Sequence, residues 1–194
     1  MQTENEKKPL KLFQKRTGKE YIIYSVIIVA GIIIDQFTKW LAVKYLAPVK
    51  SIPIINEVLH LTYLENTGAA FGMLKDSRWV FMFSSTIMLV VLFGYLYLGF
   101  ADNMLYAVSV AMIASGGIGN MIDRIFLGYV VDFIDFQLIN FAVFNGADSF
   151  VCVGACLLVV VLIRDMIKEY REKKANANGG GADGKSGEAD GKKL

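Results

Sequence analysis

Histidine and cysteine are scarce in this chain of 194 residues. His60 is the single histidine, and Cys152 and Cys156 are the two cysteines. One histidine cannot supply the pair of an HExxH zinc site, and a Ser-His-Asp triad would have to use this residue. A Ser-Lys dyad finds no serine beside Lys39 in the sequence. The two cysteines are spaced i, i+4, so they cannot bridge within one helix and are expected to pack as small side chains.

Charged residues are also scarce over four long stretches. The composition is 55% hydrophobic and 12% aromatic, and the mean hydropathy is +0.46, which fits an integral membrane protein better than a soluble domain. A bilayer core of about 30 Å needs roughly 20 apolar residues in a helix. The sequence therefore predicts four membrane spans, at about 21–46, 79–100, 104–126 and 147–164.

Basic residues are absent from the loop 127–146 and concentrated toward the two ends of the chain. Of the 20 Lys and Arg, six precede the first span and eight follow the last. By the positive-inside rule both termini are cytoplasmic and the loops 47–78 and 127–146 are outside. This predicts a basic cytoplasmic N-terminus (1–20), a four-span membrane domain (21–165) and a cytoplasmic tail (166–194).

The two ends of the chain differ in composition. Residues 175–194 are Gly-rich and charged, and we expect them to be disordered. The basic start and the run 21–34 could form a secretory signal peptide, but Asp35 and Lys39 stand where its cleavage pattern should be. The pI of 8.4 does not indicate a nucleic-acid partner, because the basic residues that raise it flank the membrane spans.

Polar residues inside the predicted spans fall at one depth. At 1.5 Å per residue, Asp35 lies roughly 21 Å above the start of its span, and Asn120 roughly 24 Å above the start of the third. The residues expected in the outer third of the bilayer are Asp35, Lys39, Asn120, Asp123, Arg124 and Asp148. Such groups are expected to face the protein interior or a wet cavity and to be functional. The alternative is that they cap helices or reach the headgroups, as Asn145 and Lys44 could.

Carboxylates are the remaining candidates for chemistry. The stretch VVDFIDF, residues 130–136, supplies Asp132 and Asp135, and Asp148 opens the fourth span. Two carboxylates about 4 Å apart repel by roughly 4 kcal/mol at an effective dielectric of 20, which separates their titrations by about 3 pH units. One member can then activate water while the other protonates a leaving amine. Composition and depth favour such a dyad without choosing between Asp132 and Asp135.

Five motifs follow one another along the chain. They are Asp35-Gln-Phe-Thr-Lys39, Glu65-Asn66-Thr-Gly-Ala-Ala-Phe71-Gly, Ser115-Gly-Gly-Ile-Gly-Asn120-Met-Ile-Asp123-Arg124, Gly128-Tyr-Val-Val-Asp132-Phe-Ile-Asp135 and Phe144-Asn145-Gly-Ala-Asp148-Ser149. Over about residues 20–165 this ordered set strongly resembles the lipoprotein signal peptidase (signal peptidase II) family.

The resemblance implies an aspartic endopeptidase of the bacterial cytoplasmic (inner) membrane, with its active site on the outer side. Such enzymes remove the signal peptide from a prolipoprotein, cutting before a cysteine that carries diacylglyceryl. The resemblance puts the catalytic aspartates at Asp132 and Asp148 and makes Asp135 a bystander. Positions that shape the site map onto Asp35, Lys39, Asn66, Asn120, Arg124 and Asn145.

The family fold is α-helical, with four transmembrane helices, a small extracytoplasmic β-structure and a short amphipathic helix. The segments 58–65 and 135–144 could supply its strands. No metal or cofactor is implied. The expected partners are lipid-modified prolipoproteins and membrane lipids, with no nucleic acid, and the expected state is a monomer.

Two other functions fit a small membrane protein with polar residues inside its spans. A proton-coupled transporter or channel would place ionisable residues throughout the membrane depth, whereas the inner two-thirds of these spans carries almost none. A non-enzymatic assembly factor would tolerate the loss of both aspartates.

Overall fold

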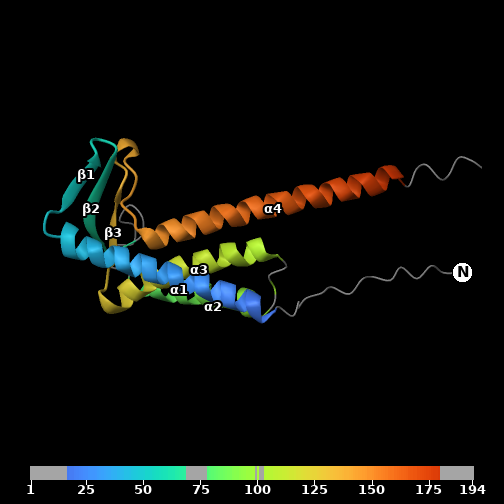
Figure 1. Cartoon of the computed structure of the whole chain (residues 1–194), viewed down its shortest axis with the longest axis horizontal. Helices are drawn as coiled ribbons and strands as arrows, with labels where there is room; N and C mark the ends of the chain where they lie inside the picture. The colour runs from blue at the N-terminus through green and yellow to red at the C-terminus, as the bar shows by residue number, and fades with distance from the viewer. Residues whose placement is uncertain (1–16, 69–77, 99, 101–102, 180–194) are drawn as a thin grey trace, which may run out of the picture. The chain divides into compact units, whose positions relative to one another are not determined.

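Four long apolar helices dominate the structure, a computed structural model that describes residues 17–68, 78–98, 100 and 103–179 (Figure 1). Within these residues, four helices are long and apolar enough to cross a membrane, and they are Gly18–Leu46, Arg78–Tyr97, Met104–Phe126 and Gly146–Asn176. The four predicted spans are confirmed, and the chain is a multi-pass membrane protein. The second span ends earlier than predicted, at Tyr97.

The first span is built from two kinds of helix. It starts with α1 (Gly18–Leu41), where the Thr17 amide donates to Glu20 Oε2 at 2.9 Å, so that a side chain satisfies one of the free donors at the helix start. It continues as the π-helical segment η1 (Ala42–Leu46). Ala42 and Leu46 are buried against Val131, so η1 connects the span to the sheet.

Three antiparallel strands form a sheet in the order β1-β2-β3, and Figure 1 shows them grouped together. They are β1 (Ser51–Ile55), β2 (Leu59–Asn66) and β3 (Val130–Asp135). β2 and β3 pair with a register shift between Leu61 and Leu64. Leu61 and Phe133 pack against η1, and this contact holds the sheet at the end of the first span.

The prediction for the third strand was wrong. The segment 58–65 matches β2, but the other strand is β3 and not 135–144. After β3 the chain forms the 3-10 helix η3 (Gln137–Ile139) and turns at Asn140, whose φ of 47° is left-handed. This turn brings Phe144 back to a single bridge with Ile134. The turn chemistry of Asn140 prevents a continuous strand.

The short amphipathic helix of the family fold is not seen as a separate element in the described ranges. The short helical segments there are η1, which continues α1, and η3, which has three residues. Residues 69–77, which include the end of the Glu65–Gly72 motif, lie outside the described residues.

Helices α1, α2 (Arg78–Tyr97) and α3 (Met104–Phe126) share an apolar core. Its buried members are Tyr24, Ile28, Leu96, Ala107, Val110, Ala111 and Ala114. The alanines of α3 allow close helix approach, as small residues do between membrane helices. The N-terminus of α3 is capped by Asn103, whose side-chain oxygen accepts from the Leu105 amide at 2.9 Å.

Two glycines on α3 bring other segments close to it. A Cβ on Gly116 would collide with the Ala147 carbonyl oxygen at the start of α4 (Gly146–Gly179). A Cβ on Gly119 would lie 2.5 Å from Asp35 Oδ2 on α1. Only glycine leaves room there for the polar groups described below.

The last helix is longer than the predicted span. Its residues up to Leu158 belong to one compact unit and those from Val159 to another. Residues 175–179, expected to be disordered, are helical, while 180–194 lie outside the described residues. Ala, Lys and Glu are strong helix formers, and Lys173 Nζ pairs with Glu169 Oε1 at 2.6 Å one turn away.

Candidate active site

Asn145 and Asp148 cap the N-terminus of α4 reciprocally. The Asn145 side-chain oxygen accepts from the Asp148 amide at 3.0 Å, and Asp148 Oδ2 accepts from the Asn145 amide at 3.2 Å. This is the bonding pattern of a capping box, which satisfies free donors at a helix start. Asn145 Nδ2 and Asp148 Oδ1 take no part in the cap, and both bind other polar groups.

Asp132 lies on β3, is 1% exposed, and is held between two amides. Asn66 on β2 donates to its Oδ2 at 2.8 Å, and Asn145 donates to its Oδ1 at 2.6 Å. Burial raises the pKa of Asp132 to about 6, with the Asp148 carboxylate adding to the rise. The two amide hydrogen bonds and the Lys39 ammonium act in the opposite direction. The carboxyl therefore titrates much nearer to neutral pH than an ordinary aspartate.

Asn120 on α3 joins the two carboxyl groups into one network. Its Nδ2 donates to Asp148 Oδ1 at 2.8 Å, and its Oδ1 accepts from Asn145 Nδ2 at 3.1 Å. Asn145 Nδ2 in turn donates to Asp132. The structure thus connects Asp132 and Asp148 through two amides from different segments.

Asp135 lies apart from this network. It accepts from the Thr62 hydroxyl at 2.8 Å and from Gln137 Nε2 at 3.2 Å. The residues alone left Asp132 and Asp135 open as partners for Asp148. Of these two, Asp132 is the residue that Asn145 and Asn120 connect to Asp148 by hydrogen bonds.

A second polar group, which we call the ionic cluster, consists of Asp35, Gln36, Lys39 and Asp123. The Lys39 ammonium lies 2.9 Å from Asp35 Oδ2 and 2.9 Å from Asp123 Oδ2, and all three side chains are nearly fully buried. Buried ion pairs require good geometry and further hydrogen bonds, because desolvation opposes them. Gln36 Nε2 supplies such bonds, to Asp35 at 3.1 Å and to Asp123 at 3.0 Å.

The ionic cluster also binds the backbone on both sides of the site. Asp35 Oδ1 accepts from the Ala147 amide at 2.7 Å, next to Asp148. Asp123 Oδ2 accepts from the Val131 amide at 3.1 Å, next to Asp132. The cluster therefore fixes the backbone beside each of the two aspartates.

Arg124 is held at the edge of the network. Its guanidinium donates to the Asn120 and Gly68 carbonyl oxygens, both at 3.4 Å, and lies 5.1 Å from the centre of the Phe81 ring. The side chain thus spans from α3 to the end of β2 and to α2.

Five of the eight predicted residues line a cavity of about 390 Å³. Its polar lining is Asn66, Ser85, Asn120, Arg124, Asp132 and Asp148. The apolar lining comes from Phe81, Val130 and residues 141–144. The volume lies within the range of about 300–1,000 Å³ that is typical of ligand-binding pockets, and the lining combines two carboxylates, an arginine and two asparagine amides.

Comparisons with known proteins identify the family of this chain. The family model for signal peptidase (SPase) II matches residues 27–164. The chain belongs to the signal peptidase II family.

Relatives of the signal peptidase II family are similar over most of their length. A lipoprotein signal peptidase of Caldanaerobacter subterraneus is 50% identical over 140 residues, which are 72% of this chain and 95% of the relative. A lipoprotein signal peptidase of Halalkalibacterium halodurans is 40% identical over 156 residues, 79% of this chain and 100% of the relative. A solved bacterial membrane enzyme structure is 28% identical, with a TM-score of 0.66, and the match covers 87% of this chain and 94% of that structure.

All eight predicted residues of this signal peptidase II chain lie in the network, in the ionic cluster or on the cavity wall. Gln36 and Asp123 were not among them, although they touch Asp35 and Lys39 directly. Asp123 was expected at the same depth as Asp35 and Lys39 but was not named as a site residue. Gln36 is three residues before Lys39, so helical spacing could have placed it on the same face.

The residues excluded from chemistry lie outside this network. His60 contacts the Ser51 hydroxyl through Nδ1 at 3.5 Å. Cys152 and Cys156, expected to pack as small side chains, are instead exposed on α4. Among the described residues no group of three or more His, Cys, Asp or Glu could hold a metal ion.

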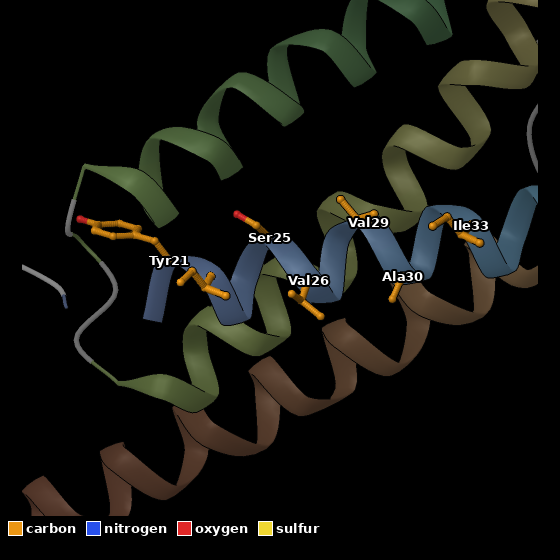
Figure 2. Close-up of a pocket in the computed structure, with 7 residues that line it drawn as sticks. Tyr21, Ser25, Val26, Val29, Ala30 and Ile33 are labelled. Carbon is orange, nitrogen blue, oxygen red and sulfur yellow. The ribbon is translucent and has the colours of Figure 1, made fainter. Parts of the chain in front are cut away.

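A second cavity, of about 480 Å³, lies along α1 and is almost wholly apolar (Figure 2). It is lined by Tyr21, Ile22, Ser25, Val26, Val29, Ala30 and Ile33. The Ser25 hydroxyl is already paired with the Tyr97 hydroxyl at 2.8 Å. This surface offers lipid-facing packing and no group for catalysis.

Proposed function

We propose that this chain is an aspartic endopeptidase that removes signal peptides from diacylglyceryl-modified prolipoproteins. It would cut before the lipidated cysteine, with Asp132 and Asp148 as the catalytic pair. The observation that carries the proposal is the single network in which Asn120 and Asn145 connect these two carboxyl groups at a cavity. The family membership and the names of the relatives support the substrate class.

The proposed reaction uses the pair as acid and base. The ionised carboxylate takes a proton from a water molecule held in the cavity, and the oxygen of that water adds to the scissile carbonyl carbon. The protonated carboxyl then donates its proton to the amide nitrogen as the carbon–nitrogen bond breaks. The pKa of about 6 for Asp132 supports a shared proton near neutral pH, where such a pair works well.

The amides would keep the pair in position during this reaction. Asn66 and Asn145 bind Asp132, while Asn120 binds Asp148, so each carboxyl keeps a fixed orientation toward the cavity. Preorganised donors of this kind need no rearrangement when charge develops. Arg124 and Lys39 neutralise nearby acids and take no direct part.

We further propose that both termini are cytoplasmic and that the active site lies on the outer side of the bacterial cytoplasmic membrane. The distribution of Lys and Arg supports this orientation. Trp40 lies near the end of α1, before the sheet, and Trp79 lies near the start of α2, after β2. Their side chains are 52% and 74% exposed, as expected for an aromatic belt at the membrane interface. One chain supplies the whole network, which supports action as a monomer, with no nucleic acid as a partner.

The test of this proposal is cleavage of a diacylated prolipoprotein peptide in detergent, followed by mass spectrometry. The wild-type protein should release a product that begins with the lipidated cysteine, and the same peptide with an unmodified cysteine should stay intact. Asp148→Asn should give no product, whereas Asp135→Asn, changed in the same way outside the network, should cleave normally. Ordinary turnover by Asp148→Asn would refute the assigned role.

A further inference from the structure

The Lys39 ammonium has three acceptors, and each comes from a different position in the sequence. Its Nζ lies 2.9 Å from Asp35 Oδ2, from Asp123 Oδ2 and from Asn120 Oδ1, and the side chain is 4% exposed. An ammonium group has three N–H donors and no acceptor. The three contacts use all of its donors, so whatever Asn120 presents to Lys39 must be its oxygen.

This contact fixes the direction of the Asn120 amide. With Oδ1 toward Lys39, the Nδ2 group points the other way and donates to Asp148 Oδ1 at 2.8 Å. Asn145 Nδ2 donates to the same Asn120 oxygen at 3.1 Å and agrees with this direction. A flipped amide would place two donors together at Lys39 and two acceptors together at Asp148.

Gln36 stabilises the remaining negative charge by donating hydrogen bonds. One ammonium faces two carboxylates in the ionic cluster, which leaves negative charge without a cation. Gln36 Nε2 lies within hydrogen-bonding distance of Asp123 Oδ1 at 3.0 Å, of Asp35 Oδ2 at 3.1 Å and of the Gly119 carbonyl at 3.2 Å. Gln36 therefore holds the two carboxylates in the positions from which they hold Lys39.

We propose that Lys39 and Gln36 are positioning residues, which fix the Asn120 amide so that its NH₂ group faces Asp148. The inference rests on the proposed function, because Asp148 acts there as one of the catalytic pair. Neither residue lines the cavity, so neither contacts the substrate. Their removal should lower kcat and leave KM nearly unchanged.

A double-mutant cycle tests whether Lys39 acts through Asn120. Lys39→Met should lower kcat about tenfold or more, with KM within about twofold. In an Asn120→Leu background the same change should lower kcat by a clearly smaller factor, about threefold, because the amide to be oriented is gone and only the effect through Asp35 and Asp123 remains. Equal losses in both backgrounds would overturn the inference. Lys44→Met removes an exposed lysine from the same span, whose ammonium lies over the Trp40 ring, and should leave kcat unchanged.

Gln36→Leu is a second variant for the case that Lys39→Met fails to fold. It keeps both ion pairs of Lys39, with Asp35 and with Asp123. It should lower kcat about threefold to tenfold at nearly constant KM. A Gln36→Leu protein that folds with wild-type kcat would contradict the inference.

A spectroscopic readout separates this inference from the proposed function. Infrared carboxyl bands can be followed against pH without substrate, and an Asp132→Asn difference identifies the Asp132 signal. The charged groups that influence Asp132 are Lys39 on α1, Arg124 on α3 and Asp148 on α4. Lys39→Met should move the Asp132 midpoint to higher pH, and Lys44→Met should not. An unmoved midpoint would count against Lys39 even if wild-type cleavage is normal, whereas absent wild-type cleavage would count against the function alone.

Discussion

The two ends of the helix bundle are stabilised by different interactions. The end near Tyr24 and Leu96 is apolar and aromatic, with Tyr21 stacked on Tyr97 at a centroid distance of 5.7 Å. The end near the sheet buries Asp35, Lys39, Asp123, Asp132 and Asn145, each 3% exposed or less. Dispersion and close packing can stabilise the first end, whereas the second requires every polar group to find a partner. The comparison indicates that the polar end depends on matched hydrogen bonds and ion pairs, whereas the apolar end depends on packing. If the proposed function holds, changes at the polar end should affect activity most and changes at the apolar end should affect stability most.

Asn145→Ala, at the polar end, should give the largest effect on activity relative to its effect on stability. The change removes the cap of α4 and the 2.6 Å hydrogen bond to Asp132 together. We expect kcat to fall about 100- to 1000-fold, as for loss of a preorganised donor. Stability should fall by about 1 kcal/mol from the lost cap. Steady-state cleavage and thermal unfolding in detergent measure the two effects.

The matched control is Asn103→Ala, which removes the N-terminal cap of α3. This cap lies at the end of α3 that is far from Asn120 and the polar network. The change should cost a similar amount of stability with kcat unchanged. If Asn145→Ala and Asn103→Ala lost activity equally, the loss would come from weaker folding, and Asn145 would have no specific role in activity.

Leu96→Ala tests the apolar end. Leu96 is fully buried, and its truncation should lower the free energy of unfolding by about 2–4 kcal/mol. The fraction that remains folded should keep its kcat. Active-site concentration must therefore be measured by inhibitor or product burst, and a lower kcat per folded molecule would break the proposed division of roles.

Asp132→Asn should increase stability at neutral pH, by no more than the amount that Leu96→Ala is expected to remove. Burial raises the pKa of this carboxyl to about 6, so the folded state holds the proton more tightly than the unfolded state between about pH 4 and 6. Stability therefore falls as pH rises through this window, by roughly 3 kcal/mol at most. The Asn variant lacks this penalty, so its Tm should exceed that of the wild type above pH 6 and match it below about pH 4. A lower Tm at neutral pH would show that the carboxylate stabilises the fold.

The sequence predicted the spans well, because they follow from apolar length. Helix rise predicted one level for Asp35, Asn120 and Asp148, and hydrogen bonds connect the segments that carry them. It could not choose between Asp132 and Asp135 from composition, because their environments depend on strand register. The shift between Leu61 and Leu64 pairs Leu64 with Asp132 and His60 with Asp135. A register shift of this kind has no simple sequence signal, and the family motifs supplied the choice instead.

The ionic cluster could be predicted only in part. Asp35 and Lys39 stand on one helix face by spacing, but their contact with Asp123 depends on the close approach of α1 and α3 at Gly119. The π-helical segment η1 was not predicted, because it depends on the local fit between the first span and the sheet. The turn at Asn140 was not predicted either, because it depends on how the chain returns from β3 to pair Phe144 with Ile134.

The most direct test of the account is the activity of Asp132→Asn, Asp148→Asn and the variant that carries both changes. Residues that act as one unit give losses that do not add. We predict that each single variant loses all measurable cleavage of the diacylated peptide above the residual rate of the double variant. Substantial turnover by either single variant, with a further loss on combining the two, would contradict a shared catalytic pair.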